Sequence, residues 1–217
     1  QALAEHGCAE LDSLVITDDV RDLSPLQGLQ RLTDMLHFRS AAALQSLHGL
    51  ESLTEVRGIQ IDNCSALQSL GALVGIEEID VLVVINNPVL PSLHGLENVR
   101  TFREDGLGGA YNSVANLILH GNTALEDISA LGRVQGNLSL ALVIQDCPLL
   151  RSLHGLEGIT GLGVSSQGLS LGSSLYLRRM NALEDISALG AIQGDLPGGI
   201  TIHSCPKLRS LRGLDSI

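Results

Sequence analysis

The chain is poor in aromatic residues and almost lacks lysine. Of its 217 residues, two are Tyr, two are Phe and none is Trp, and Lys207 is the single lysine. Hydrophobic residues nevertheless make up 44% of the chain, so its core must consist of Leu, Ile and Val. Aliphatic side chains of this kind stack well in the repeated layers of a solenoid.

Positive charge is also scarce. The chain has 13 Lys and Arg residues against 24 Asp and Glu residues, which gives a formal net charge of −11. Nucleic-acid binders need a basic face to neutralise phosphates, and anionic membranes attract basic segments. The charge therefore argues against both, and it chiefly favours solubility. No run of about 18 apolar residues occurs, so we expect no direct membrane insertion.

What the chain does contain is a repeated apolar ladder. An Asn or Cys is followed by Leu three residues later and then by apolar residues at every third position. Clear copies run over 64–73, 87–96 and 147–156. Regular repetition of this kind predicts a solenoid, in which each coil touches only its neighbours.

The ladders also show a longer period. Their starting positions, which we call the ladder positions, are Val20, Ala41, Cys64, Asn87, Asn122, Cys147, Met180 and Cys205. Cys64, Asn122 and Met180 follow one another at intervals of 58 residues, and the same interval separates Cys147 from Cys205. Residues 124–132 and 182–190 are both Ala-Leu-Glu-Asp-Ile-Ser-Ala-Leu-Gly. Duplication of a two-coil unit is the simplest origin of this pattern.

Short segments rich in β-branched and other aliphatic residues precede the ladder positions. They are 59–61, 83–85, 117–119, 142–144, 175–177 and 200–202. Alternation at period two predicts strands with one face inward, and period three in the ladder suits a short 3₁₀ turn or an extended coil. The sequence therefore predicts a mainly β fold, a right-handed parallel β-solenoid of about eight coils.

The pattern of strand, Asn or Cys, Pro, x, Leu, as in 83–96 and 144–156, resembles the receptor L-domain. That leucine-rich-repeat-like module occurs in insulin and epidermal growth factor receptor ectodomains, and related modules occur in fungal cell-wall and bacterial surface proteins. An ordinary leucine-rich repeat runs Asn-x-Leu, whereas two residues separate Asn or Cys from Leu here. The resemblance covers the chain from about residue 11 onward. It implies a β-solenoid, extracellular or cell-surface placement and a binding role, although no flanking Cys-rich module is seen.

We expect one repeat domain over 1–217, with 1–10 as a candidate N-terminal cap. The last ladder, Leu208 to Leu214, is not followed by a strand segment. This predicts a chain truncated in mid-repeat, or one whose end is disordered.

The cysteines are predicted to fill layers and not to form disulfides or metal sites. Cys64, Cys147 and Cys205 share the ladder position, and coils spaced about 4.8 Å apart leave them beyond disulfide reach. Asn at this position can bond to neighbouring backbone groups. The pairing of Cys8 is open. Without a Cys-x-x-Cys pair, no zinc site is predicted, and no cofactor is expected.

Histidines and acidic residues recur in rows. His48, His94 and His154 each precede Gly-Leu, and Gln27 and Arg212 take the same place in other coils. A polar residue before a turn glycine accounts for them, and a pH-sensing column is the alternative. Glutamates follow the same Gly-Leu, and Glu-Asp pairs form a second row. No loop has the ligand order of a Ca²⁺ site, so we expect no metal.

Candidate contact residues are few. Tyr111, Tyr176, Arg178 and Arg179 are the aromatic and basic side chains that we expect to face a partner. Gly-rich segments at 104–113 and 161–174 are further candidate binding loops. Asn63 and Asn137 match the N-glycosylation pattern, which matters only in a eukaryotic secreted protein.

No catalytic constellation stands out, so the first hypothesis is a non-catalytic extracellular recognition or adhesion module that binds a protein or glycan. The alternative is a structural protein of a cell wall, surface layer or filament, because solenoids that lack caps expose edge strands and can self-associate. A carbohydrate-active enzyme is a minor alternative.

Overall fold

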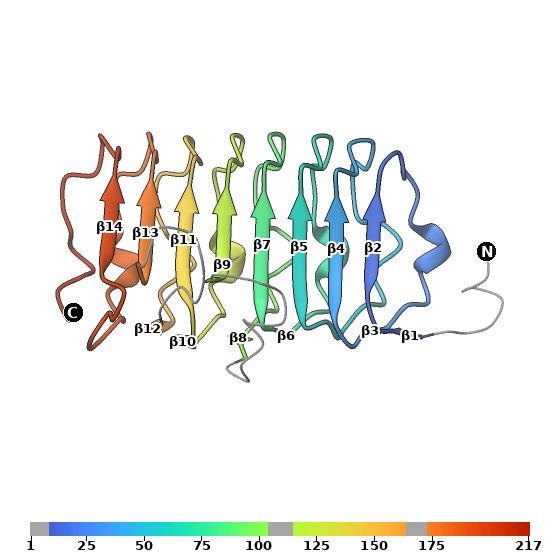
Figure 1. Ribbon diagram of the computed structural model, residues 1–217, viewed down its shortest axis with the longest axis horizontal. Coiled ribbons are helices and arrows are strands. Elements are labelled where there is room, and N and C mark those ends of the chain that lie inside the picture. The colour runs from blue at the N-terminus through green and yellow to red at the C-terminus, as the bar shows by residue number, and fades with distance from the viewer. Residues whose placement is uncertain (1–8, 104–114, 164–172) are drawn as a thin grey trace.

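The computed structural model describes residues 9–103, 115–163 and 173–217, which form a parallel β-solenoid (Figure 1). One parallel sheet of eight strands runs the length of the molecule. In spatial order its strands are β2 (Leu14–Thr17), β4 (Met35–Arg39), β5 (Gly58–Asp62), β7 (Val81–Ile85), β9 (Ala115–His120), β11 (Ala141–Gln145), β13 (Leu175–Arg178) and β14 (Ile200–His203). Eight stacked strands, separated by seven turns of chain, confirm the predicted solenoid, and all six predicted strand segments lie within these strands.

Three small parallel pairs form where the chain turns back toward the sheet. They are β1 (Glu10–Leu11) with β3 (Arg31–Leu32), β6 (Glu78–Ile79) with β8 (Thr101–Phe102), and β10 (Gly136–Leu138) with β12 (Ile159–Leu162). Each pair joins neighbouring coils, so the coils are hydrogen-bonded to one another on more than one side.

The core consists of aliphatic columns that run along the solenoid axis. Successive side chains of a strand point to opposite faces of the sheet, and in β7 Leu82 and Val84 point inward. Leu82 lies opposite Ile59 of β5 and Leu117 of β9, and all of these side chains are fully buried. Repetition of the same inward sites allows the molecule to build its core with few aromatic rings.

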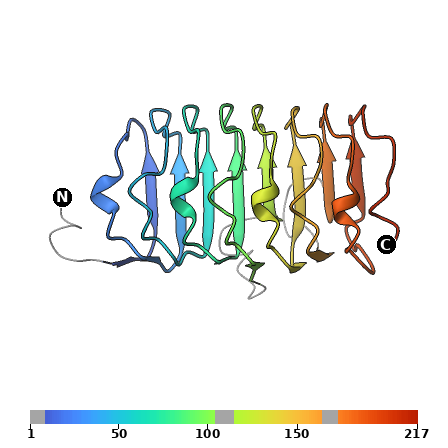
Figure 2. The same cartoon turned by 180° about the vertical axis from the view of Figure 1, so that it is seen from behind.

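The ladder segments alternate between two kinds of turn. Every second coil contains a 3₁₀ helix, seen on the side opposite the sheet in Figure 2. These helices are η1 (Ser24–Leu26), η2 (Gly71–Leu73), η4 (Ser129–Leu131) and η5 (Ser187–Leu189). The coils between them carry the His-Gly-Leu turns and the related Arg212-Gly-Leu turn. The two-coil unit inferred from the 58-residue period is therefore a physical pair of unlike turns.

The glycine of the His-Gly-Leu turn is required by its neighbour. Gly155 has a φ of +108°, and a Cβ placed on it would lie 2.5 Å from the carbonyl oxygen of Ile128 in the preceding coil. Gly28, which follows Gln27, has nothing within 4 Å of such a Cβ. The equivalence of Gln27 with the histidines in the alignment of the repeats is therefore not structural, because Gln27 caps the C-terminal end of η1.

Candidate functional site

The outward face of the sheet carries a row of chemically different side chains along the solenoid. We call it the outer row, and each member lies at the end of its strand, opposite the next in register. Its members are Thr17, Arg39, Asp62, Ile85, His120, Gln145, Arg178 and His203. None of them is fully buried. The row therefore presents charged, amide, imidazole and hydroxyl groups on a regular scaffold.

A second outward row, two residues earlier in each strand, changes character along the sheet. It begins with Val15, His37 and Gln60 and ends with Thr201. Between them lie four side chains that are at most 8% exposed: Val83, Ile118, Val143 and Tyr176. Tyr176, a predicted contact residue, packs with this apolar cluster and is only 6% exposed. Its ring therefore offers little surface to a partner.

Near the N-terminal end, the two rows meet in a cluster around Asp62. His37 Nε2 lies 3.2 Å from Asp62 Oδ2, and the Gln60 amide donates to the same oxygen. The other carboxylate oxygen of Asp62 is buried and has no hydrogen-bond partner. Arg39 and Asp62 are opposite one another in the outer row, so this part of the face carries both charges.

A second polar cluster surrounds His120. Gln145 Nε2 lies 2.7 Å from His120 Nδ1, and His120 Nε2 lies 3.5 Å from Asp146 Oδ2. Burial is the main influence that lowers the pKa of His120 below its usual 6.5, with help from the charge of Arg179, although Asp146 opposes both. The imidazole is therefore neutral near pH 7. Because the Gln145 amide nitrogen donates to Nδ1 of His120, the proton of the neutral imidazole lies on Nε2, which faces Asp146.

The two predicted contact arginines have different surroundings. Arg178 belongs to the outer row, between Gln145 and His203, and is partly exposed. Arg179 lies in the turn after β13, with a φ of +52°. Its Nε and one terminal nitrogen bind the two oxygens of Asp146 at 2.7 and 2.8 Å, a bidentate geometry that fixes the guanidinium. Tyr111 lies outside the described residues.

Sequence reasoning missed most of the outer row, although the signal was present. Every member except Thr17 lies two residues before a ladder position, and that offset could have been read from the alignment. The polar contacts could not be read from that alignment, because His120 and Gln145 are 25 residues apart and their contact depends on strand register.

The Asn and Cys residues at the ladder positions perform a common structural task. Asn87 Nδ2 donates to the carbonyl oxygens of Ile61 and Ile85, both at 3.0 Å, and Asn87 Oδ1 accepts from the backbone N–H of Cys64. One coil further along, Asn122 Oδ1 accepts in the same way from the backbone N–H of Asn87. The predicted hydrogen bonds from Asn at the ladder positions to neighbouring backbone groups are thus confirmed.

Cysteine replaces asparagine in this ladder because its thiol also reaches the backbone. Cys147 Sγ lies 3.5 Å from the carbonyl oxygen of Gln145. This carbonyl is equivalent to that of Ile85, to which Asn87 donates in its own coil. Cys64, Cys147 and Cys205 are free thiols, as predicted, and Cys8 lies outside the described residues. Burial raises the pKa of Cys147 to about 12, so this thiol stays protonated and unreactive near neutral pH.

The His-Gly-Leu-Glu turns form a uniform row at the side of the molecule. His154 Nδ1 lies 2.7 Å from Glu157 Oε1, while Glu157 Oε2 accepts from the Gly155 N–H at 2.8 Å. Partial burial favours the protonated acid, but the hydrogen bonds from its own N–H, His154 and Gly155 prevail and lower the pKa of Glu157. The carboxylate holds the turn, which supports the structural interpretation of the histidines.

The Asp of the repeated Glu-Asp-Ile-Ser segments also has a local partner. Asp185 accepts from the backbone N–H and hydroxyl of Ser187 at 3.0 and 2.7 Å, at the start of η5. These bonds lower the pKa of Asp185. In the described part of the chain, no group of three or more His, Cys, Asp or Glu side chains is arranged to hold a metal ion.

The remaining sequence candidates fall on the surface or outside the described residues. Asn63 and Asn137 are both exposed; Asn63 Oδ1 accepts from Asn86 and Asn137 Oδ1 accepts from Thr160. Their glycosylation stays a prediction. Most of the two Gly-rich segments lies within 104–114 and 164–172, outside the described residues.

Comparison of the chain with protein-family models, curated proteins and solved structures finds no match. A search of the described residues finds no helix that is both long and apolar enough to cross a bilayer.

Proposed function

We propose that this protein is a non-catalytic recognition module of the cell exterior, an L-domain-like solenoid that binds a protein or glycan through the outer row of its sheet. The observation that carries the proposal is the contrast between rows. Each kind of turn repeats its chemistry in every second coil, whereas the outer row changes its side chain from each strand to the next.

Rigidity and mixed chemistry support a binding role for this face. Among the described residues, the outer row lies on strands that pair with neighbours on both sides, except at the two ends of the sheet. Its polar groups are therefore held at fixed positions before a partner arrives, which lowers the entropic cost of binding. Arginine and partly exposed polar groups beside a buried apolar cluster match the composition of protein interfaces.

The test compares two variants with the same change of charge on different sides. Arg178→Glu alters the outer row, while Arg151→Glu alters a 73% exposed arginine of a ladder segment. The purified protein and both variants are screened on a glycan array and against a panel of extracellular domains. We expect a specific ligand whose affinity falls about tenfold or more in Arg178→Glu only. Absence of any specific ligand, or an equal loss in both variants, would contradict the proposal.

A further inference from the structure

Arg178 is a cation of the outer row that has no counter-ion within the described part of the chain. Its side chain is partly exposed, and no carboxylate of the described residues binds its guanidinium. The neighbouring Arg179 instead binds both oxygens of Asp146, so the charge of that carboxylate is already compensated. Because arginine stays charged and carries five N–H donors, Arg178 is able to bind an anionic group of a ligand.

The half of the outward face around Arg178 is locally basic. It is formed by the last four strands of the sheet, each taken with the residue that follows it: 115–121, 141–146, 175–179 and 200–204. The charged residues in these ranges are Arg178, Arg179 and Asp146, which gives 2 − 1 = +1, although the whole chain carries −11. Charges more than about 8 Å away are largely screened at physiological salt, so a bound group responds chiefly to this local charge.

The other half of the face is less suited to an anion. Arg39, the second arginine of the outer row, lies opposite Asp62, and one buried carboxylate oxygen of Asp62 has no hydrogen-bond partner. An anion that approaches Arg39 therefore also approaches Asp62, and like charges repel. The positions beside Arg178 carry Gln145 and His203, neither of which is acidic.

The neighbours of Arg178 supply further polar groups in a straight line. Gln145 Nε2 uses one N–H to bind His120 Nδ1 and has a second. His203 Nδ1 lies 2.8 Å from the Ser204 hydroxyl, which leaves His203 Nε2 for a ligand. Adjacent strands are about 4.8 Å apart, and the outer row follows the arrowhead ends of the strands along the solenoid axis (Figure 1). One sugar unit of an extended polysaccharide has a similar length.

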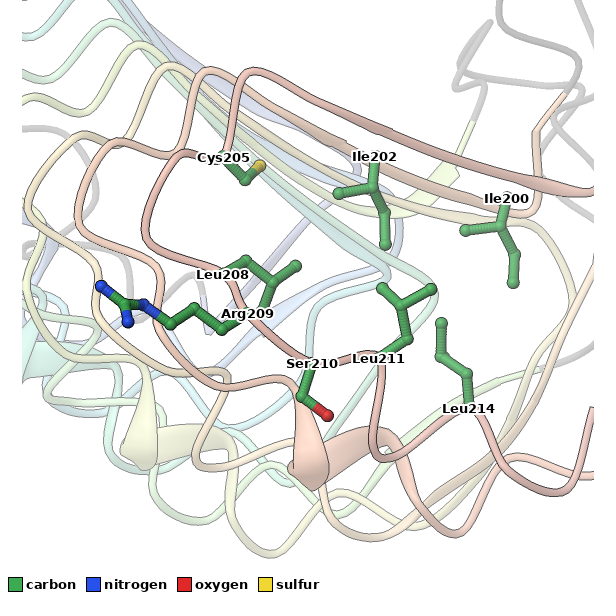
Figure 3. A pocket seen from close by; sticks show the side chains of 8 residues that line it. All are labelled: Ile200, Ile202, Cys205, Leu208, Arg209, Ser210, Leu211 and Leu214. Atoms are coloured by element: carbon green, nitrogen blue, oxygen red, sulfur yellow. The ribbon is translucent and has the colours of Figure 1, made fainter.

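The apolar side chains of this half of the face are covered. Ile118, Val143 and Tyr176 are at most 8% exposed, whereas protein interfaces depend on aromatic or aliphatic anchors. Exposed apolar side chains lie elsewhere: Ile200 and Leu211 line an open hollow of about 570 Å³ on the core side of β14 (Figure 3). A polysaccharide rich in hydroxyl groups needs no such anchor, so it fits this polar surface better than a protein does.

We infer that the outer row around Arg178 binds the carboxylate groups of an acidic polysaccharide whose chain lies along the solenoid axis. The planar guanidinium of Arg178 pairs with a carboxylate through two parallel hydrogen bonds, and Gln145 and His203 bind hydroxyl groups of the adjacent sugar units. This inference rests on the proposed binding role of the outer row and names the class of its ligand.

The test uses polymers that differ in charge. Polygalacturonate and hyaluronan bear carboxylates, the methyl ester of each is a neutral control, and dextran sulfate bears sulfates alone. Binding of the purified protein to the immobilised polymers is measured by surface plasmon resonance at physiological salt. We expect at least one carboxylate polymer to bind, and its methyl ester and dextran sulfate to bind about tenfold or more weakly.

Matched variants place the binding at Arg178. Arg178→Gln should weaken binding of the carboxylate polymer about tenfold or more. Arg178→Lys, which keeps the charge but lacks the planar fork, should lose several-fold. Arg151→Gln changes the 73% exposed arginine of a ladder segment and should bind within about twofold of the native protein. Circular dichroism verifies that all three variants are folded.

The outcomes separate this inference from the function on which it rests. No binding of either carboxylate polymer, equal binding of acid and ester, equal binding of dextran sulfate, or an equal loss in Arg151→Gln would overturn the inference. If the protein binds another ligand from the glycan array or the protein panel, and Arg178→Glu abolishes that binding, the outer row is still the binding face and the class of ligand is wrong. If no ligand of any kind is found, both proposals fail.

Discussion

The turn row and the outer row are built on the same coils but follow opposite rules. The turn row repeats Ser, Leu, His, Gly, Leu and Glu in three coils, and each Gly lies close to the backbone of the coil before it. The outer row changes residue type from strand to strand and has few contacts that the fold requires. Positions that hold one coil against the next are therefore restricted to a few residue types, while positions that face away from the core are free to vary and to bind.

Removing the buried hydrogen bonds of an Asn at a ladder position should have the largest effect on stability. Asn87→Ala removes the partners of two carbonyl groups and of the Cys64 N–H, so we expect a loss of about 3 kcal/mol or more in unfolding free energy. Asn87→Cys, which retains a donor of the kind found at Cys64 and Cys147, should lose clearly less. Urea denaturation followed by circular dichroism measures both, and equal losses would show that the amide has no special role.

The turn glycine should rank second. Gly155→Ala forces a Cβ against the Ile128 carbonyl at a positive φ, so we expect a loss of about 2 kcal/mol. Gly28→Ala meets no neighbouring atom, and it should lie between no change and a gain of about 1 kcal/mol. The same denaturation experiment compares them. Similar losses at both glycines would mean that close approach between coils does not restrict this row.

The Glu157 carboxylate should contribute less and in a pH-dependent way. Glu157→Gln weakens the bonds to His154 and Gly155, and a partly exposed hydrogen bond of this kind contributes about 1 kcal/mol. Because the pKa of Glu157 is lowered in the folded protein, its contribution is present above the unfolded value of 4.5. It is lost as the pH falls through the folded pKa. Thermal melts between pH 3 and pH 7 should show the native protein and the variant converging at low pH, and a constant difference would contradict this.

The outer row should respond least in stability. Arg178→Ala removes a partly exposed side chain that faces away from the core, so we expect a change within about 0.5 kcal/mol. The contrast with Gly155→Ala in the same denaturation series tests the division between restricted and variable rows directly. If Arg178→Ala lost as much unfolding free energy as Gly155→Ala, the Arg178 side chain would be required for the stability of the fold.

Much of the architecture could be predicted because the same sequence pattern recurs in each coil. The ladder positions, the strands before them and the two-coil unit follow from periodicity, and the roles of Asn87 and Cys147 follow from their shared position. The candidate site could be predicted only in part. Arg178, chosen for its charge, lies in the outer row, and its contact with a partner stays a prediction. Tyr176 was expected to face a partner but packs in the apolar cluster with Val143 and is only 6% exposed. Period-two alternation tells which side chains point outward, and it does not tell which of them become covered.

The sequence by itself determined that the chain forms stacked parallel coils with an aliphatic core, since periods of two and three leave one way to bury its leucines. The tertiary structure decided which groups meet between coils. His120 with Gln145, Arg179 with Asp146, and Gly155 with Ile128 are separated by 25 to 33 residues. Their contacts exist because backbone hydrogen bonds fix the register between strands, and intervening loops of different length hide that register from the linear sequence.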